Sequence, residues 1–389
     1  MCKKIVYVDN AATTPVSEEC YKAMEPFFKE HFANPSSIYS IAHTTKNALE
    51  KARATAAECL NALPEEIYFT SCGSESNNWA LYSTAHLQKK LHNKNRIITT
   101  NFEHHSILNC CKNLSRQGFD VTFLPVDREG LISAHQIEQA IDEKTALVSV
   151  MTANNEIGTI QPIAEIGKIC LENNIPLHTD AVQAVGHVAI DVQAQKLSLL
   201  SLSGHKIGAP KGIGLLWVKK NLPLQNLIFG GAQENQKRAG TENVAFAVGL
   251  ATCLKRATSN IEARENKIKK MQTFLLDGVL RSIPKVKVNG SLEHRLSSNL
   301  NFSFAGIEGE SILLMLDSYG ICASSGSACT SHSLDPSHVL LAIGLEHELA
   351  HGSLRISLSE NNTMQEMEHI LNCLPKVVER LRQISPIWK

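Results

Sequence analysis

Residues 201–218 read SLSGHKIGAPKGIGLLWV, a stretch that joins two short apolar runs through a tight, glycine-rich connection. The pattern predicts a strand, a turn and a second strand. Lys206 follows Ser203 and His205 on the connection, where glycine and proline leave its amine little freedom to reach solvent. A partly desolvated lysine amine is nucleophilic and can form a Schiff base with a carbonyl cofactor. Taken alone, a solvated loop lysine is the commoner case.

Short apolar runs alternate with helix-favouring stretches on the N-terminal side of this connection. We expect strands at residues 66–70, 96–99, 121–124, 146–151 and 176–179, and helices at 43–63 and 163–172. Such alternation predicts an α/β fold with an open, mostly parallel sheet wrapped by helices. In sheets of this kind, ligands bind where the carboxyl ends of the strands meet loops.

The texture of the sequence changes after about residue 244. Residues 245–280 are charged and helix-favouring, and we interpret them as one long helical connector to a smaller α+β unit. In that unit we expect strands at 300–304 and 354–358, a helix at 310–319 and a terminal helix. We therefore predict a large domain of residues 14–258 and a small domain of residues 1–13 and 259–389.

Composition and charge exclude several classes of protein. The 389 residues are 43% hydrophobic and 20% charged, a globular balance. Lysine plus arginine equals aspartate plus glutamate, 38 each, so bulk charge indicates no nucleic-acid partner. We find no apolar run of membrane-spanning length and no signal-peptide core, and we therefore expect a cytoplasmic protein with no membrane partner. The 11 cysteines show no metal-ligand or disulfide spacing.

Polar clusters fall at the predicted carboxyl ends of the strands. They are Gly73 with Ser74, His104, Asn155, Asp180 with Gln183, and Ser203 with His205 and Lys206. The turn at Gly73 exposes backbone N–H groups at a helix start, which suits an anion, although an ordinary serine cap explains it equally well. Asp180 alone reads as a helix cap and His104 as a core histidine. As a set they supply what a pyridoxal phosphate enzyme requires: a lysine, a carboxylate, a phosphate cradle and a flat group over the ring.

The motifs around these residues run from one end of the chain to the other. They are YVDNAATTP (7–15), NPSS (34–37), FTSCGSESNN (69–78), EHHS (103–106), NNEIG (154–158), HTDAVQ (178–183), SLSGHKIGAPKG (201–212), GGAQENQKRAGTEN (230–243), SSGSACTS (324–331) and LRISLS (354–359). In these motifs the chain resembles a cysteine desulfurase of the NifS/IscS type, a class V, fold type I pyridoxal phosphate enzyme.

The resemblance implies a role for each cluster. Lys206 would form the Schiff base, His104 would stack on the cofactor ring, and Asp180 would pair with the pyridine nitrogen. Gln183 and Asn155 would approach the phenolic oxygen or the substrate. The phosphate would be bound by Gly73, Ser74, Ser203 and His205, joined by Thr241 of the neighbouring subunit. This last assignment implies a homodimer.

The small polar residues 324–331 contain Cys329 and have few apolar anchors, which suits a thiolate that must move between substrate and acceptor. An incidental exposed cysteine is the alternative from the loop alone. The resemblance implies that Cys329 attacks the sulfur of L-cysteine, keeps it as a persulfide and releases L-alanine. Arg355 would clamp the substrate carboxylate, helped by Asn34 and Asn155. His104 would also move protons.

The resemblance further implies an acceptor for the sulfur: a NifU/IscU-like iron–sulfur scaffold or another protein, such as one that thiolates tRNA. No resident metal is expected, although Cys329 would ligate an iron–sulfur cluster transiently during transfer. The C-terminus, SPIWK, is shorter than in IscS-like members, which favours a NifS-like subtype and leaves the scaffold open.

Two alternatives stand beside this interpretation, and a third is excluded. A selenocysteine lyase or an aminotransferase of the same class would not need Cys329. A non-catalytic scaffold would not need Lys206, Asp180 and Cys329. A P-loop is excluded because the glycine-rich segment lacks the GxxxxGK[ST] spacing.

Overall fold

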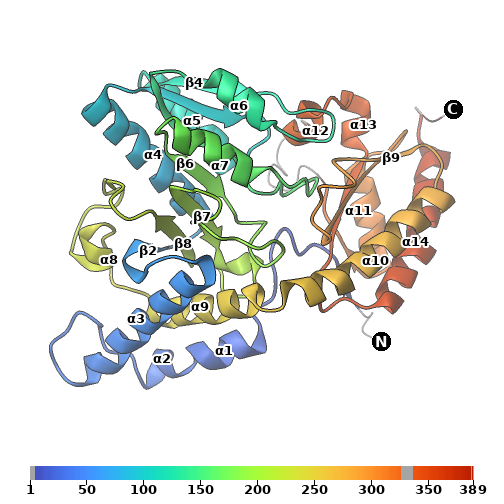
Figure 1. Ribbon diagram of the computed structural model, residues 1–389. Coiled ribbons are helices and arrows are strands. Elements are labelled where there is room, and N and C mark those ends of the chain that lie inside the picture. The colour runs from blue at the N-terminus through green and yellow to red at the C-terminus, as the bar shows by residue number, and fades with distance from the viewer. Residues whose placement is uncertain (1–4, 326–335, 387, 389) are drawn as a thin grey trace.

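The computed structural model describes residues 5–325, 336–386 and 388, so Cys329 lies outside the described residues (Figure 1). A seven-stranded sheet forms the centre of the larger part, in the order β2-β8-β7-β6-β5-β3-β4. Its strands are β2 (Ile67–Thr70), β3 (Arg96–Thr100), β4 (Asp120–Leu124), β5 (Thr145–Ser149), β6 (Leu177–Asp180), β7 (Leu199–Ser203) and β8 (Gly214–Val218). Strands β7, β6, β5, β3 and β4 are parallel, whereas β8 runs antiparallel to β2 and β7. The predicted mostly parallel sheet is confirmed.

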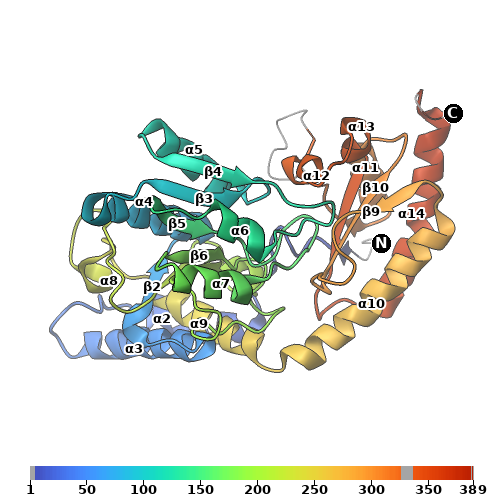
Figure 2. The same ribbon diagram turned by 45° about the horizontal axis from the view of Figure 1, so that its top comes forward.

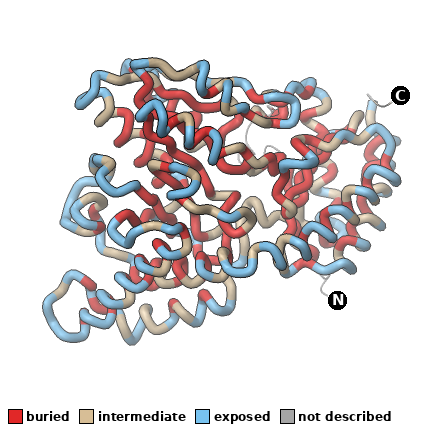
Figure 3. Tube along the Cα trace, viewed as in Figure 1, coloured by how far each residue is buried: buried red, intermediate tan, exposed pale blue. Residues whose placement is uncertain are grey.

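Helices cover both faces of this sheet, and successive side chains of a strand point to opposite faces. Leu147 and Leu199 pack with helices α4 (Gly73–His92) and α5 (His105–Arg116). Their neighbours Val148 and Leu200 belong to the core on the other face. Buried strands covered on both sides read as continuous apolar runs, as β5, β7 and β8 do. Figure 3 shows these strands as a buried trace inside more exposed helices.

The face of the sheet opposite α4 and α5 is covered by helices that include one closely packed pair. Helix α3 (Ile41–Leu60) lies against α9 (Val244–Thr258), below the strands in Figures 1 and 2. Other helices of this larger part are α1 (Glu18–Met24), α2 (Pro26–Lys29), α6 (Ala134–Ala140), α7 (Ile163–Glu172) and α8 (Gln233–Gln236), with the short 3₁₀ turns η1 (Pro64–Glu66) and η2 (Gly204–Lys206). Helix α1 begins after Ser17, whose hydroxyl accepts from the Cys20 N–H and so caps the helix.

A smaller unit lies at the other end of the molecule, at the right of Figures 1 and 2. Strand β10 (Asn299–Phe304) lies between β9 (Val286–Val288) and β12 (Ser353–Ser357), antiparallel to both. Strand β1 (Val6–Tyr7) pairs in parallel with β11 (Ile321–Cys322). Helices α10 (Ile261–Ser282), α11 (Gly309–Ser318) and α14 (Met364–Ile384) belong to this unit. Helices α12 (His338–Ala342) and α13 (His347–His351) lie in the same part of the sequence, but their most buried residues join the core of the larger part. A separate apolar core joins β1 and β10 to α10 and α14. The domain bounds stay a prediction.

The connector between the two parts differs from the sequence expectation of one long helix. Helix α9 ends at Thr258, and α10 begins after Asn260, which has a left-handed φ of 50°. Ser259 donates its hydroxyl to a carbonyl of the last turn of α9, a bond that competes with helix continuation. The Arg264 guanidinium also binds carbonyls at the end of α9, including that of Ala257. A break at this point lets α10 diverge towards the smaller unit.

Among the residues that the structure describes, no helix combines the length and apolar character needed to span a membrane.

Candidate active site

A pocket of about 290 Å³ opens at the carboxyl ends of β6 and β7. Its lining includes these predicted site residues: Gly73, Ser74, His104, Asn155, Asp180, Gln183, Ser203, His205, Lys206 and Arg355. Two other predicted residues lie elsewhere in this chain. Asn34 is exposed, and Thr241 lines a second pocket beside Arg238. Parallel strands that end at one edge bring the first group together.

Lys206 is held by the N-terminal segment. Its Nζ donates to the carbonyls of Ala11 and Ala12 at 2.5 and 2.7 Å. The turn that carries Lys206 is tight: a Cβ on Gly204 would lie 2.8 Å from a methyl of Ile213. The amine therefore has a fixed direction, as the glycine-rich connection predicts.

The segment after Ala12 also fixes His205. Thr13 Oγ1 lies 3.1 Å from His205 Nδ1, and Thr14 donates its hydroxyl to the His205 carbonyl. Burial, with the charges of Lys206 and Lys211, lowers the pKa of His205 to about 4. His205 is therefore a neutral imidazole at physiological pH.

Asp180 ends β6 and is buried. Its Oδ2 accepts from Asn77 Nδ2 at 2.6 Å, and its Oδ1 accepts from the Val182 N–H at 2.9 Å. These two donors fix the plane of the carboxylate. Sequence reasoning missed Asn77, although it lies three residues after Ser74 on α4 and so shares a helix face with a predicted phosphate ligand.

His104 caps the start of α5. Its Nδ1 accepts from the Ser106 N–H at 3.1 Å and lies 2.8 Å from the Ser106 hydroxyl. Burial lowers the pKa of His104, and the charges of Lys206 and His105 act in the same direction while Asp180 opposes them. In the neutral ring, the hydrogen is on Nε2 because Nδ1 accepts. A neutral, fixed aromatic ring suits both stacking and proton exchange.

Arg355 comes from the middle of β12, and its side chain is 4% exposed. Nη2 pairs with Asp9 at 2.9 Å, and Nη1 donates to the Asn155 carbonyl at 3.0 Å. Among the described residues, Arg355 Nε and Asn155 Oδ1 have no hydrogen-bond partner. Buried polar atoms without partners are rare, and these two belong to residues that line the pocket. A polar ligand would satisfy them.

The start of α4 forms the other end of the pocket. A Cβ on Gly73 would lie 2.8 Å from Val182 Cγ2 and 3.3 Å from Ser203 Cβ, so glycine permits this approach. Cys72 caps the helix through its sulfur, which accepts from the Glu75 N–H at 3.4 Å. The free N–H groups and dipole of a helix of 20 residues attract an anion.

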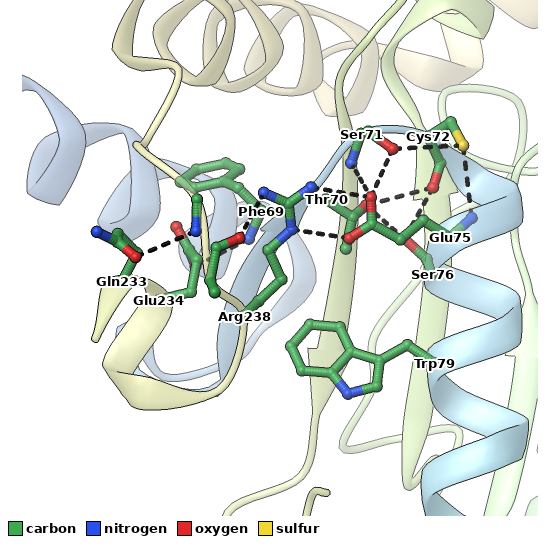
Figure 4. Close-up of polar contacts among 12 residues, drawn as sticks. Phe69, Thr70, Ser71, Cys72, Glu75, Ser76, Trp79, Gln233, Glu234 and Arg238 are labelled. Carbon is green, nitrogen blue, oxygen red and sulfur yellow. Dashed lines mark hydrogen bonds and ion pairs between the residues drawn. The ribbon is translucent and has the colours of Figure 1, made fainter. Parts of the chain in front are cut away.

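An ion pair attaches a distant segment to this helix start (Figure 4). Arg238 donates to both Glu75 oxygens at 2.9 and 3.1 Å, and the Ser71 N–H donates to Glu75 as well. Burial opposes ionisation of Glu75, but the bonds from Arg238 and Ser71 prevail and lower its pKa. Thr241 lies three residues after Arg238, so its segment is fixed to the first turn of α4.

The chain is similar to known proteins along nearly its whole length. Residues 6–370 match the aminotransferase class-V family. This chain belongs to the class-V family. Class-V relatives include "Cysteine desulfurase IscS" of Clostridium botulinum (strain Hall), 52% identical over 388 residues that cover 99% of this chain and 97% of the relative. "Cysteine desulfurase IscS" of Methanosarcina thermophila is 50% identical over 384 residues, with 99% and 94% covered.

Solved structures of similar proteins agree with the fold. A NifS-like protein superposes with a TM-score of 0.91 at 35% identity, over 97% of this chain and 100% of the other. The NifS-like protein of Rickettsia africae gives 0.86 at 31% identity, over 96% and 99%. The cofactor of a class-V chain is pyridoxal phosphate. The pocket fits this group, since it offers an amine, a buried carboxylate and a helix N-terminus closed by glycine.

Proposed function

We propose that this chain is a cysteine desulfurase that removes sulfur from L-cysteine and releases L-alanine. The observation that carries the proposal is the convergence of Lys206, Asp180 and Arg355 on one pocket. Over 99% of its length the chain shares 50–52% of its residues with two relatives named cysteine desulfurase.

Bound pyridoxal phosphate supplies an electron-accepting ring that stabilises negative charge at the substrate Cα. We assign Lys206 to its covalent attachment, Asp180 to the ring nitrogen and His104 to the ring face. Gln183 lies beside them and donates to the Ala11 carbonyl at 2.9 Å. The phosphate ligands are Gly73, Ser74, Ser203 and His205.

The substrate is oriented from the smaller unit. The planar guanidinium of Arg355 can bond both oxygens of a carboxylate, and Asp9 and the Asn155 carbonyl hold its plane. Lys206 then moves the Cα proton. The Ala11 and Ala12 carbonyls accept hydrogen bonds from Nζ and so hold the amine in place. His104 would exchange protons through Nε2, because its Nδ1 accepts from the Ser106 N–H: the Nε2 proton is given up and one is then taken back.

Cys329 completes the reaction in this proposal. Its thiolate attacks the substrate sulfur: an S–S bond forms, the Cβ–S bond breaks, and the electron pair and a proton go to Cβ to give the methyl group of alanine. Ser324, which precedes Cys329 by five positions, exchanges two backbone hydrogen bonds with Arg355, at 2.6 and 3.2 Å. The chain that leads to Cys329 therefore leaves β11 beside the proposed carboxylate ligand.

We also propose the remaining partners. A second copy of the chain would bring Thr241 to the phosphate and Asn34 to the substrate, since neither reaches the Lys206 pocket of its own chain. The persulfide would pass to a NifU/IscU-like scaffold or another sulfur acceptor in the cytoplasm. The larger unit, residues 14–258, would be the cofactor domain, and the smaller one would carry Cys329.

The test measures alanine and sulfide formed from L-cysteine with a reductant present, while the visible spectrum reports bound cofactor. Wild type and Cys322→Ser should form alanine, because Cys322 lies on β11 away from the described pocket lining. Cys329→Ser should keep the spectrum, respond to L-cysteine and form no alanine. Full activity of Cys329→Ser would refute the persulfide role and favour a selenocysteine lyase or an aminotransferase.

A further inference from the structure

The described chain that follows Cys329 makes several contacts with the larger part. Cys329 lies eight positions before Ser337, and Ser337 caps helix α12. Two residues of that helix, Val339 and Leu340, have no exposed surface and belong to the core of the large sheet rather than to that of the smaller unit. The chain therefore re-enters the protein against the cofactor half.

The Ser337 hydroxyl both accepts and donates hydrogen bonds. It accepts from the N–H groups of Val339 and Leu340 at 3.1 and 3.3 Å, and it donates to Glu156 Oε2. Glu156 is buried and follows Asn155, which is a proposed substrate ligand. One hydroxyl thus joins the helix start to the loop that carries Asn155.

His338 makes a second attachment. Its Nε2 lies 2.9 Å from the carbonyl of Glu103, and because a carbonyl only accepts, Nε2 carries the hydrogen. Its ring also packs on that of His105, with centroids 4.5 Å apart. Glu103 and His105 flank His104, the proposed ring-stacking residue. Burial lowers the pKa of His338 to about 4, so this bond is made by a neutral ring at physiological pH.

We propose that Ser337 and His338 are positioning residues for sulfur transfer: they fix the end of the Cys329 segment to the two loops that hold His104 and Asn155. Neither residue touches the substrate in this scheme. They fix the point at which the chain after Cys329 joins the described structure. The inference rests on the proposed function, because it requires Cys329 to be the sulfur acceptor.

The decisive variant is Ser337→Ala in the holoenzyme, which loses the donor to Glu156 and the cap of α12. Ser337→Thr keeps the hydroxyl and should restore function. The matched control is Ser133→Ala, since Ser133 also caps a helix, α6, through a hydroxyl that accepts at 3.1 Å. Three readouts are needed: alanine formation, persulfide per Cys329, and the L-cysteine concentration that half-saturates the spectral change of the cofactor.

We expect Ser337→Ala to lower alanine and persulfide formation about 10-fold or more, because small displacements of reacting groups have large kinetic effects. The half-saturating L-cysteine concentration should change by less than about twofold, since the cofactor and carboxylate ligands are unchanged. Ser337→Thr and Ser133→Ala should resemble wild type. His338→Phe, which keeps a ring but loses the N–H, should show the same selective loss and serves if Ser337→Ala does not fold.

The inference is overturned if both variants form persulfide within about twofold of Ser133→Ala. It is also overturned if L-cysteine binding and alanine formation fall equally, since this would indicate general disruption. The proposed function fails separately, through a wild type that forms no alanine or an active Cys329→Ser.

Discussion

The two halves of the pocket place their polar and charged side chains at different positions along their strands. In the large sheet, Asp180 and Ser203 stand at the ends of parallel strands, where polar groups meet the pocket without being placed inside the sheet. In the smaller sheet, Arg355 stands in the middle of an antiparallel strand and is almost fully buried. A buried charge is costly unless paired, and Asp9 supplies the partner. The cofactor end therefore depends on strand ends, and the substrate end on one ion pair.

The largest effect should follow from breaking the strand-end group at Lys206. Lys206→Ala removes the amine that attaches the cofactor and moves the substrate proton, and we expect alanine formation to fall at least about 10³-fold. Lys211→Ala is the matched control, because Lys211 is exposed on the same connection. The assay is alanine release from L-cysteine. A Lys206→Ala enzyme within tenfold of Lys211→Ala would remove Lys206 from the mechanism.

A smaller effect should follow from Arg355→Lys in the other half. Lysine keeps the charge but cannot bond Asp9, the Asn155 carbonyl and a substrate carboxylate in one plane. We expect KM for L-cysteine to rise about 10²-fold with a smaller change in kcat. Arg382→Lys is the control, since Arg382 also binds carbonyls in the smaller unit. Equal KM values for the two variants would show that Arg355 is only structural.

The smallest effect concerns Glu103, a buried acid of the cofactor half that, unlike Arg355, has no ion-pair partner among the described residues. Burial raises the pKa of Glu103 to about 8 from an ordinary value of 4.5. Between these pH values the folded protein keeps a proton that the unfolded chain has lost. The free energy of unfolding therefore falls as pH rises, by up to about 1.4 kcal/mol per pH unit.

Glu103→Gln removes this titration and keeps an oxygen for the bonds from Thr100 and the Met151 N–H. The Tm of the variant relative to wild type should increase steadily from pH 5 to pH 8. Glu348→Gln, at an exposed site, should show no such trend. A Tm difference that is constant with pH would mean that Glu103 is ionised in the folded protein.

Local patterns predicted most of the elements, because they depend on neighbouring residues. Helix α7 matches its predicted bounds, and the strands shift by one or two residues. Strand order could not be predicted: β8 inserts between β2 and β7, a choice made by packing. The break before α10 was missed, although Thr258, Ser259 and Asn260 are weak helix formers in sequence.

The cofactor end of the site was predictable because its residues follow strands directly. The partners that hold them were not, since Asn77 lies on a helix and Asp9 lies far from Arg355 in sequence. Asn34 and Thr241 do not line the described Lys206 pocket, and the roles proposed for them require a second chain. Their roles stay predictions.

The N-terminal segment sets the order in which the site can be assembled during synthesis. Residues 11 and 12, which hold the Lys206 amine, leave the ribosome early. Strand β1, just before them, can pair only after β11 has been synthesised, because Val6 lies opposite Ile321. Asp9 can form its ion pair only later still, once Arg355 has been synthesised. Such distant contacts form late. The last strand of the large sheet ends at Val218, so a nascent chain can complete that sheet well before Arg355 has been synthesised. The pocket is therefore complete only late in translation.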